Sequence, residues 1–138
     1  MTRLTRLAAL AAVLVALTAS AQPPPRPDWE ALADVETLEV VTHDEDGSPR
    51  ETTIWLVVVD GQGFIRTGGT TWGDNVERDP EVVLRIEGVE YALRAEFIEN
   101  EALRERVVLT FREKYGFTDA MLSLFRGGHP RIMHMIPR

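Results

Sequence analysis

One run of residues constrains the fold more than any other part of the sequence. Every position from 52 to 59 is occupied by a β-branched or apolar residue, in the order Thr-Thr-Ile-Trp-Leu-Val-Val-Val. A run of this length without a polar face is typical of a strand that is buried on both sides. Asp-Gly pairs at 46–47 and 60–61 flank the run and favour tight turns there. The sequence therefore predicts that residues 52–59 form the central strand of a sheet.

Hydrophobic periodicity places further elements along the chain. Alternating patterns predict strands at 38–42, 63–67, 81–87, 91–98 and 131–136. A stripe at four-residue spacing predicts a helix over 101–114 that ends at Gly116, and a second, shorter helix is expected over 118–125, with Thr118 as its cap. Short helical turns are expected at 28–33, where Asp28 is the cap, and at 74–78. Five or six strands in meandering order, with these helices, predict an α+β domain whose antiparallel sheet curls toward a barrel.

The first 21 residues have the pattern of a cleavable signal peptide. Arg3 and Arg6 precede an apolar run over 7–17, which is followed by Ala19-Ser20-Ala21, an A-x-A cleavage site. The run is shorter than the roughly 20 residues that a membrane-spanning helix needs, so no stable membrane anchor is expected. The sequence therefore predicts an exported protein, periplasmic or secreted. Its parts would be the signal peptide (1–21), a proline-rich linker with a short helical turn (22–34) and one domain (35–138).

Composition excludes several classes of function. The formal charge of −7 disfavours nucleic acid as a partner, because an acidic surface repels phosphate backbones. The absence of cysteine excludes thiol catalysis and thiolate metal sites, and leaves stability to an apolar core. His43, His129 and His134 lack the spacing of a zinc site, so no metal is expected. No nucleophile elbow or phosphate-binding P-loop is present.

The segment after the strand at 63–67 carries the best candidate for a ligand site. Arg66 and Thr67 end that strand, a glycine pair follows, and hydroxyl, indole and amide side chains come next at Thr70, Thr71, Trp72 and Asn75. Glycine lets backbone amides approach a ligand, and a guanidinium can donate two hydrogen bonds to a phosphate. The segment is therefore interpreted as an anion-binding loop. The alternative is a surface loop in which the indole only covers the end of the barrel.

A set of short motifs in a fixed order resembles the pyridoxamine phosphate oxidase-like, flavin-binding split-barrel family, near its deazaflavin-dependent nitroreductase branch. The motifs are Asp46-Gly47-Ser48-Pro49-Arg50, Thr52-Thr53-Ile54-Trp55, Val57-Val58-Val59, Asp60-Gly61, Phe64-Ile65-Arg66-Thr67, Trp72, Asn75, Asp79-Pro80, residues 82–84, Lys114-Tyr115-Gly116 and residues 132–138. The resemblance implies a six-stranded split β-barrel that forms a homodimer and holds a flavin or deazaflavin in a cleft between subunits.

By position, the resemblance also assigns roles to individual residues. Arg66 and Thr67 would bind the cofactor phosphate with help from Trp72 and Asn75. The ring would be lined by Thr52, Thr53, Ile54 and Trp55, and Arg50 is a further candidate for cofactor binding. Many flavin-binding members have a lysine in the phosphate loop where this chain has Thr-Thr-Trp at 70–72. The cofactor is therefore left open between FMN, a deazaflavin coenzyme and none, and Trp55 between a ring contact and a core aromatic.

These observations favour an exported flavin- or deazaflavin-dependent oxidoreductase whose substrate the sequence does not indicate. No catalytic side chain is assigned, because a flavin ring itself supplies hydride chemistry. Two alternatives remain at this stage. One is a protein of the same fold that binds a cofactor or small ligand without turning it over, and the other is a cofactor-free dimeric interaction protein.

Overall fold

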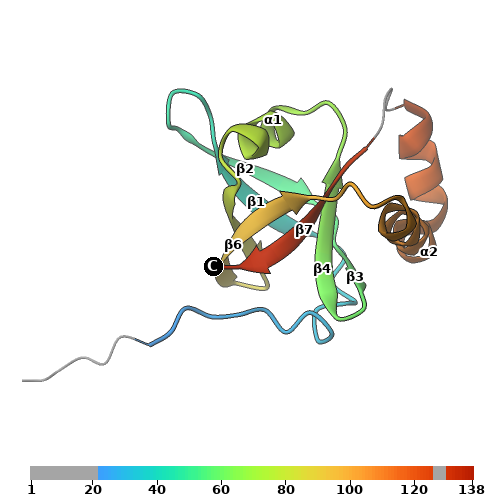
Figure 1. Cartoon of the computed structure of the whole chain (residues 1–138), viewed down its shortest axis with the longest axis horizontal. Helices are drawn as coiled ribbons and strands as arrows, with labels where there is room; N and C mark the ends of the chain where they lie inside the picture. Colours follow the sequence, from blue (N-terminus) through green and yellow to red (C-terminus); the bar gives the residue numbers. More distant parts are fainter. Residues whose placement is uncertain (1–21, 126–129) are drawn as a thin grey trace, which may run out of the picture.

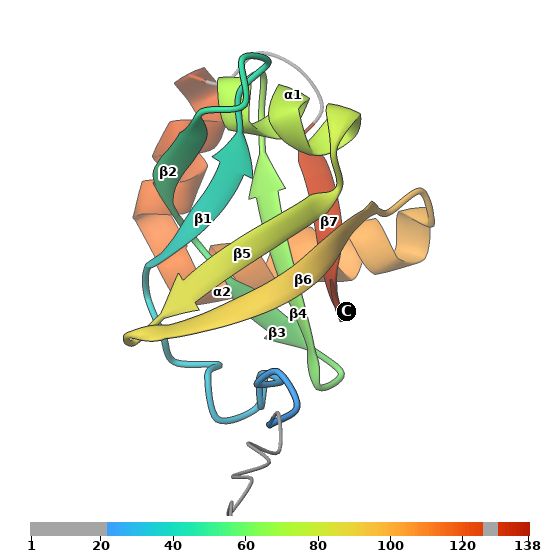
Figure 2. The ribbon, with the colours of Figure 1, turned by 90° about the vertical axis from the view of Figure 1, so that its left-hand side faces the viewer.

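The computed structural model describes residues 22–125 and 130–138, and it describes side chains for 22–116 and 130–138. One antiparallel sheet of seven strands, in the order β2-β1-β5-β6-β7-β4-β3, curls into a half-barrel (Figures 1 and 2). The strands are β1 (Leu38–His43), β2 (Pro49–Ile54), β3 (Val57–Val59), β4 (Gln62–Thr67), β5 (Glu81–Ile86), β6 (Val89–Phe97) and β7 (Arg131–Pro137). The helices are α1 (Thr71–Arg78) and α2 (Glu101–Phe125).

The α+β class and the curled antiparallel sheet are confirmed, but the predicted strand count of six is wrong. The extra strand arises because the run 52–59 is not one central strand. It is divided between β2 and β3, which lie at the two opposite edges of the sheet, with Trp55 and Leu56 between them. Leu56 is buried among the residues inside the half-barrel, whereas Val57 is buried beneath α2. Consecutive apolar residues therefore serve two separate clusters, which the pattern alone cannot distinguish from a doubly buried strand.

The interior of the half-barrel is an apolar core with a cover at each end. Trp72 and Val76 of α1 join the core at one end, and Trp29 and Leu32 of the N-terminal turn join it at the other. The turn at 28–33 is present as predicted, and the amide of Ala31 donates to Asp28 Oδ1 over 3.4 Å. A Cβ on Gly63 would lie 2.6 Å from the ring of Trp29, so only glycine lets this indole pack so closely.

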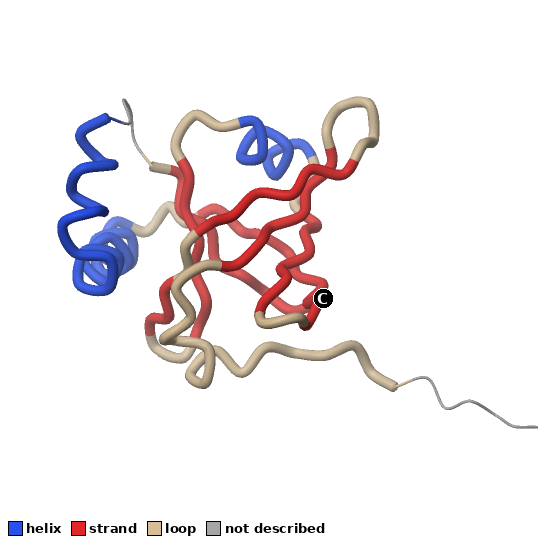
Figure 3. The backbone as a smooth tube through the Cα atoms, turned by 180° about the vertical axis from the view of Figure 1, so that it is seen from behind, coloured by secondary structure: helices blue, strands red, loops and turns tan. Residues whose placement is uncertain are grey.

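Helix α2 lies outside the sheet and forms a second apolar cluster against it (Figure 3). Val107 and Phe111 are fully buried there against Phe64 and Ile132 of the sheet. The predicted break at Gly116 is confirmed, because this residue has φ 58° and ψ −132° inside the helical span. The capping side chain proposed at Thr118 lies outside the side chains that the structure describes.

The predicted signal peptide also lies outside the described residues, so export remains a prediction. Across residues 22–125 and 130–138, no helix is both long and apolar enough to cross a membrane.

Candidate functional site

A cavity of about 450 Å³ opens between β2, the end of β4 and the start of α1. It brings together two stretches that the sequence analysis had selected separately. Its lining residues are Arg50, Thr52, Thr53, Ile54, Trp55, Arg66, Thr67, Thr70, Thr71 and Trp72. Every residue proposed from the sequence to bind a cofactor, apart from Asn75, therefore contributes to one cavity.

Strand register explains why alternate residues of β2 form one wall of this cavity. Arg50 pairs with Thr42, and Ile54 pairs with Leu38. Cross-strand partners share a face of the sheet, and Thr42 and Leu38 are buried. The side chains of Arg50, Thr52 and Ile54 therefore lie on the inner face of β2, where burial increases from the exposed Arg50 to the buried Ile54.

The cavity is positively charged in a chain whose formal charge is −7. Among the described residues that line it, Arg50 and Arg66 are the charged ones, and no carboxylate is present. Five threonines add hydroxyl groups that can donate or accept hydrogen bonds. Guanidinium groups form strong, often bidentate hydrogen bonds with phosphate, so this lining is suited to an anion.

The N-terminus of α1 reinforces this positive character. Thr70 is the N-cap, and its Oγ1 accepts a hydrogen bond from the amide of Gly73 over 3.2 Å. Its hydroxyl also lies 2.6 Å from that of Thr67, which fixes the end of β4 to the start of the helix. Thr71 and Trp72, the first two residues of the helix, line the cavity. The partial positive charge of a helix N-terminus is therefore directed at the same space as the two arginines.

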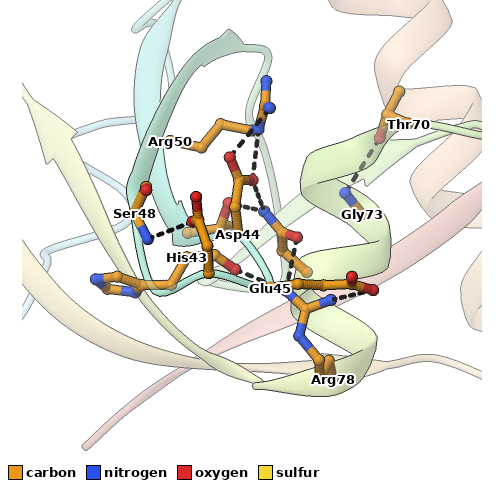
Figure 4. Close-up of polar contacts among 11 residues, drawn as sticks. His43, Asp44, Glu45, Ser48, Arg50, Thr70, Gly73 and Arg78 are labelled. Carbon is orange, nitrogen blue, oxygen red and sulfur yellow. Dashed lines mark hydrogen bonds and ion pairs between the residues drawn. The ribbon is translucent and has the colours of Figure 1, made fainter.

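Arg50 is held in place by Asp44, which lies just before the Asp-Gly pair at 46–47 (Figure 4). Arg50 Nε donates to Asp44 Oδ1 over 2.7 Å, and its Nη2 donates to Oδ2 over 3.1 Å. These bonds, together with one from Asn75, hold the pKa of the Asp44 carboxyl below its usual value of 3.8. Asp44 is therefore ionised at neutral pH. No local spacing signals this pair, because the partners come from opposite ends of a hairpin turn.

Asn75 occupies a different position from the one proposed for it. It is absent from the cavity lining and is buried, with 3% of its surface exposed. Its Nδ2 donates to Thr42 Oγ1 over 3.1 Å and to Asp44 Oδ1 over 2.8 Å, and its Oδ1 accepts from Arg78 Nη2 over 2.9 Å. Arg78 also donates to the carbonyl of His43 over 2.9 Å. Asn75 therefore joins α1 to β1 and to the turn that follows it.

Arg66 lies between the cavity and helix α2. Its guanidinium carbon sits 4.2 Å from the centre of the Phe111 ring, a cation–π arrangement. The residue also borders a second hollow, beside α2. Packing against the helix thus limits the conformations in which Arg66 can reach a ligand.

Trp55 packs against α2 and also borders the cavity. Its ring stacks on Tyr115 with the ring centres 4.1 Å apart and the planes 4° from parallel. Tyr115 is fixed in turn, since its hydroxyl accepts from the amide of Leu56 over 3.1 Å and donates to the carbonyl of Glu36 over 2.7 Å. Burial raises the pKa of this phenol, which keeps it protonated. Trp55 is therefore packed against α2 and also lines the cavity.

Arg131 at the start of β7 is a supporting residue that the sequence analysis missed. Its Nη2 donates to the carbonyl of Gly68 over 2.7 Å, and its Nη1 donates to Asp74 over 3.0 Å. This side chain passes so close to Gly73 that a Cβ there would collide with it. Arg131 thus holds the loop at 68–70 against α1. Contacts spanning 57 to 63 residues leave no signal in local sequence.

The histidines of the described chain do not contribute to the cavity lining. His134 stacks on Phe64 with ring centres 5.1 Å apart, and burial lowers its pKa. Within the described residues, no group of three or more histidine, aspartate or glutamate side chains is placed to hold a metal ion. His129 lies outside the described residues.

Comparison with known proteins identifies a family and a fold. A family model described as "Uncharacterized protein conserved in bacteria (DUF2255)" matches residues 28–131. No curated protein matches the chain at a significant level.

Several solved structures share the fold at low sequence identity. The putative pyridoxamine 5′-phosphate oxidase from Listeria innocua has a TM-score of 0.56 and 17% identity, over 79% of this chain and 91% of that chain. An F420-H2 dependent reductase has a TM-score of 0.58 and 16% identity, over 73% and 94%. The heme storage protein HutZ from Vibrio cholerae has a TM-score of 0.63 and 17% identity, over 84% and 92%. The chain thus has the split-barrel fold of pyridoxamine 5′-phosphate oxidase-like proteins and F420-dependent reductases.

Proposed function

Since the chain belongs to the DUF2255 family and has this split-barrel fold, we propose that it binds a flavin or deazaflavin cofactor and acts as an oxidoreductase. The observation that carries the proposal is the cavity of about 450 Å³, whose charged lining consists of Arg50 and Arg66. An acidic chain that gathers two guanidinium groups around one opening has a site suited to an anionic ligand.

The cavity also suits the flat, apolar part of such a cofactor. Ile54, Trp55 and Trp72 supply apolar surface on the same lining as the arginines and hydroxyls. The stacking of Trp55 on Tyr115 presents a rigid aromatic surface that loses little conformational freedom when a planar ring binds. We therefore assign the phosphate to the arginines and the N-terminus of α1, and the ring to the β2 wall.

A bound flavin or deazaflavin would supply hydride transfer itself, and the residues of this chain would bind, orient and shield it. Arg50 and Arg66 would hold the anionic tail, and the threonine hydroxyls would offer hydrogen bonds to polar groups of the ring or tail. The aromatic and apolar side chains would exclude water from one side of the ring. No carboxylate or histidine among the described lining residues is available for proton transfer. Substrate protons would therefore be exchanged with solvent.

One feature of the lining favours a flavin-type ligand over heme. A heme iron is usually held by histidine, cysteine, methionine or tyrosine, and none of these residues occurs in the described lining. Two arginines would match the two carboxylates of a porphyrin, but they leave the metal without a protein ligand. Binding without turnover remains the second candidate function, because the described lining lacks an acid–base pair.

Dimerisation and export are part of the same proposal. A homodimer follows from the family resemblance, and light scattering coupled to gel filtration tests it. Export follows from the pattern of residues 1–21. Mass spectrometry of the protein recovered from cell fractions tests it, because cleavage after Ala21 would leave a chain that begins at Gln22.

Ligand binding tests the proposal directly. The purified protein is titrated with FMN, coenzyme F420 and heme, and binding is followed by absorbance, fluorescence and calorimetry. We expect saturable binding of a flavin or of F420. Arg66→Gln, which keeps a side chain over Phe111, should weaken binding about tenfold, as expected for the loss of one charge-assisted hydrogen bond.

Arg106→Gln is the matched control, because the Arg106 side chain pairs with Asp60 and lies away from the cavity lining. Equal loss in both variants would remove the assignment of Arg66 to the phosphate. Failure of every flavin and deazaflavin to bind would refute the proposed function. If a cofactor binds, its reduction by a nicotinamide donor and reoxidation by an added acceptor separate an enzyme from a carrier.

A further inference from the structure

Asp44 lies next to the cavity without lining it, and its carboxylate binds one residue that lines the cavity and one that belongs to α1. Its carboxylate accepts two hydrogen bonds from Arg50, at 2.7 and 3.1 Å, and a third from Asn75 at 2.8 Å. Figure 4 shows this carboxylate beside the guanidinium of Arg50 on β2, and the amide that donates the third bond belongs to α1. One acidic side chain therefore links the cavity arginine to the helix whose N-terminus lines the same cavity.

The helix side of this link is more rigid than the arginine side. Asn75 is buried and also donates to Thr42, which has 1% of its surface exposed. The side chain of Arg50 is 43% exposed. A long, exposed arginine samples many rotamers unless a partner restrains it. The buried amide thus fixes Asp44, and Asp44 in turn fixes Arg50.

The same network lies beside the cavity rather than at a distance from it. Thr71 borders both the cavity and the neighbouring hollow that contains Asp44, Asn75 and Arg78. Because Arg50 donates through Nε and Nη2, its Nη1 and the second hydrogen on Nη2 remain directed away from Asp44. A carboxylate bound along the Nε–Nη2 edge of a guanidinium thus leaves the Nη1 side available to a second anion, such as a ligand phosphate.

We propose that Asp44 is a positioning residue for the cofactor phosphate: anchored by Asn75, it fixes the Arg50 guanidinium at the mouth of the cavity. The inference rests on the proposed function and adds to it a residue that does not contact the ligand. It also makes an unusual prediction about charge, because an acid beside an anion site would improve binding of the anion.

Net charge and positioning predict opposite results for Asp44→Asn. If only charge mattered, removal of a carboxylate near the site would tighten binding of a phosphate-bearing ligand. If positioning matters, the variant would bind that ligand more weakly, since Arg50 would lose its restraint. Asp46→Asn is the matched control. Asp46 lies on the same turn, but its carboxylate accepts from the amide of Ser48 over 2.9 Å, whereas Arg50 donates to Asp44.

The test compares ligands with and without a phosphate in the full-length variants. The probes are FMN against riboflavin, and coenzyme F420 against its phosphate-free deazaflavin chromophore. The pair that the wild type binds is the informative one. We expect Asp44→Asn to bind the phosphate-bearing ligand of that pair about five- to tenfold more weakly than the wild type does, and to bind the phosphate-free ligand with unchanged affinity. Asp46→Asn should bind both members as tightly as the wild type or slightly more tightly.

A ligand-independent measurement tests the restraint itself. In ¹⁵N spectra of the wild type, the Nε–H group of Arg50 should give a distinct signal that exchanges slowly with water. This signal should merge with the exposed arginines in Asp44→Asn and persist in Asp46→Asn. Backbone amide spectra confirm that both variants are folded.

The outcomes separate the inference from the function on which it rests. If the wild type prefers the phosphate-bearing ligand and Asp44→Asn keeps or strengthens this preference, the positioning role is overturned while the proposed function stands. An unchanged Arg50 signal in Asp44→Asn overturns it as well. If the wild type binds no member of either pair, the proposed function fails, and the role of Asp44 toward a phosphate fails with it.

Discussion

Replacement of Asn75 by alanine tests the network that joins α1 to the sheet. Three hydrogen bonds disappear: those to Thr42 at 3.1 Å and to Asp44 at 2.8 Å, and the one from Arg78 at 2.9 Å. A neutral buried hydrogen bond contributes about 1 kcal/mol and one to a charged group about 1.5 kcal/mol or more. The bond from Arg78 contributes little, because that side chain is 41% exposed and can bind water instead.

The expected change in the free energy of unfolding follows from these terms. The bonds to Thr42 and Asp44 together amount to about 2.5 kcal/mol. Alanine regains up to about 0.7 kcal/mol through its higher helix propensity. We therefore expect Asn75→Ala to lower the free energy of unfolding by about 2 kcal/mol, measured by urea denaturation with an unchanged m-value.

Asn75→Asp distinguishes the lost bonds from a general effect of substitution in a helix. The aspartate keeps the size of the side chain, but it places a second carboxylate beside Asp44, where the two groups now lie 2.8 Å apart. At neutral pH this variant should be less stable than Asn75→Ala, and it should recover part of the difference below about pH 4, where one carboxylate is protonated. A loss below about 1 kcal/mol in Asn75→Ala, or an aspartate variant as stable as the alanine variant, would refute the reasoning.

Three other predictions concern the surroundings of the site. Gly73→Ala should destabilise the protein by about 1–3 kcal/mol in a urea titration, because the new Cβ would collide with the side chain of Arg131. Gly69→Ala is the control, since a Cβ there has no neighbouring atom within 4 Å, and its stability should stay within about 0.5 kcal/mol of the wild type. Phe111→Ala should cost about 3–5 kcal/mol and be seen as a lower midpoint of thermal unfolding, since the ring is fully buried beneath α2. The folded-state pKa of Asp44 is lowered from 3.8, so the ionised carboxylate stabilises the fold above pH 3.8, and this effect is lost as the pH falls toward the lowered pKa. The free energy of unfolding, measured between pH 5 and pH 2, should therefore fall less steeply in Asp44→Asn than in the wild type. Equal slopes in the two proteins would contradict this.

The sequence predicted the parts of the fold that depend on local chemistry. The strand at 38–42 corresponds to β1, and the turn beside it places Gly47 at φ 86°, a conformation that favours glycine. The break at Gly116 was predicted for the same reason. The run at 52–59 was misinterpreted because apolar periodicity reports burial and not pairing. Val57 and Val59 are buried beneath α2 on a strand that pairs only with β4.

The residues that line the candidate site were predicted from their type and their order in the sequence. The residues that hold those lining residues in place were not predicted. Arg66 and Thr67 were assigned to a ligand site by their place before a glycine pair, and the structure puts them in the cavity lining. Asp44 contacts Asn75 across 31 residues of chain, and Arg131 contacts Gly68 across 63 residues. Neither side chain belongs to a local motif. Asn75 was placed with the ligand residues because it follows them in sequence. Asn75 lies one helical turn beyond Trp72, however, and its side chain binds Thr42 of β1 instead of lining the cavity.

Helix α2 supports the candidate site from outside the sheet, whereas α1 covers one end of the half-barrel. Phe111 lies under the Arg66 guanidinium and Tyr115 lies under the Trp55 ring, so one residue from each wall of the cavity rests on this helix. The two aromatic residues are four positions apart and therefore lie on the same face of the helix. A small displacement of α2 would move the arginine and the indole together, whereas Arg50 would stay with β1 and α1. The two arginines of the cavity thus belong to two separately anchored parts of the fold, and the distance between Arg50 and Arg66 depends on how both helices pack on the half-barrel.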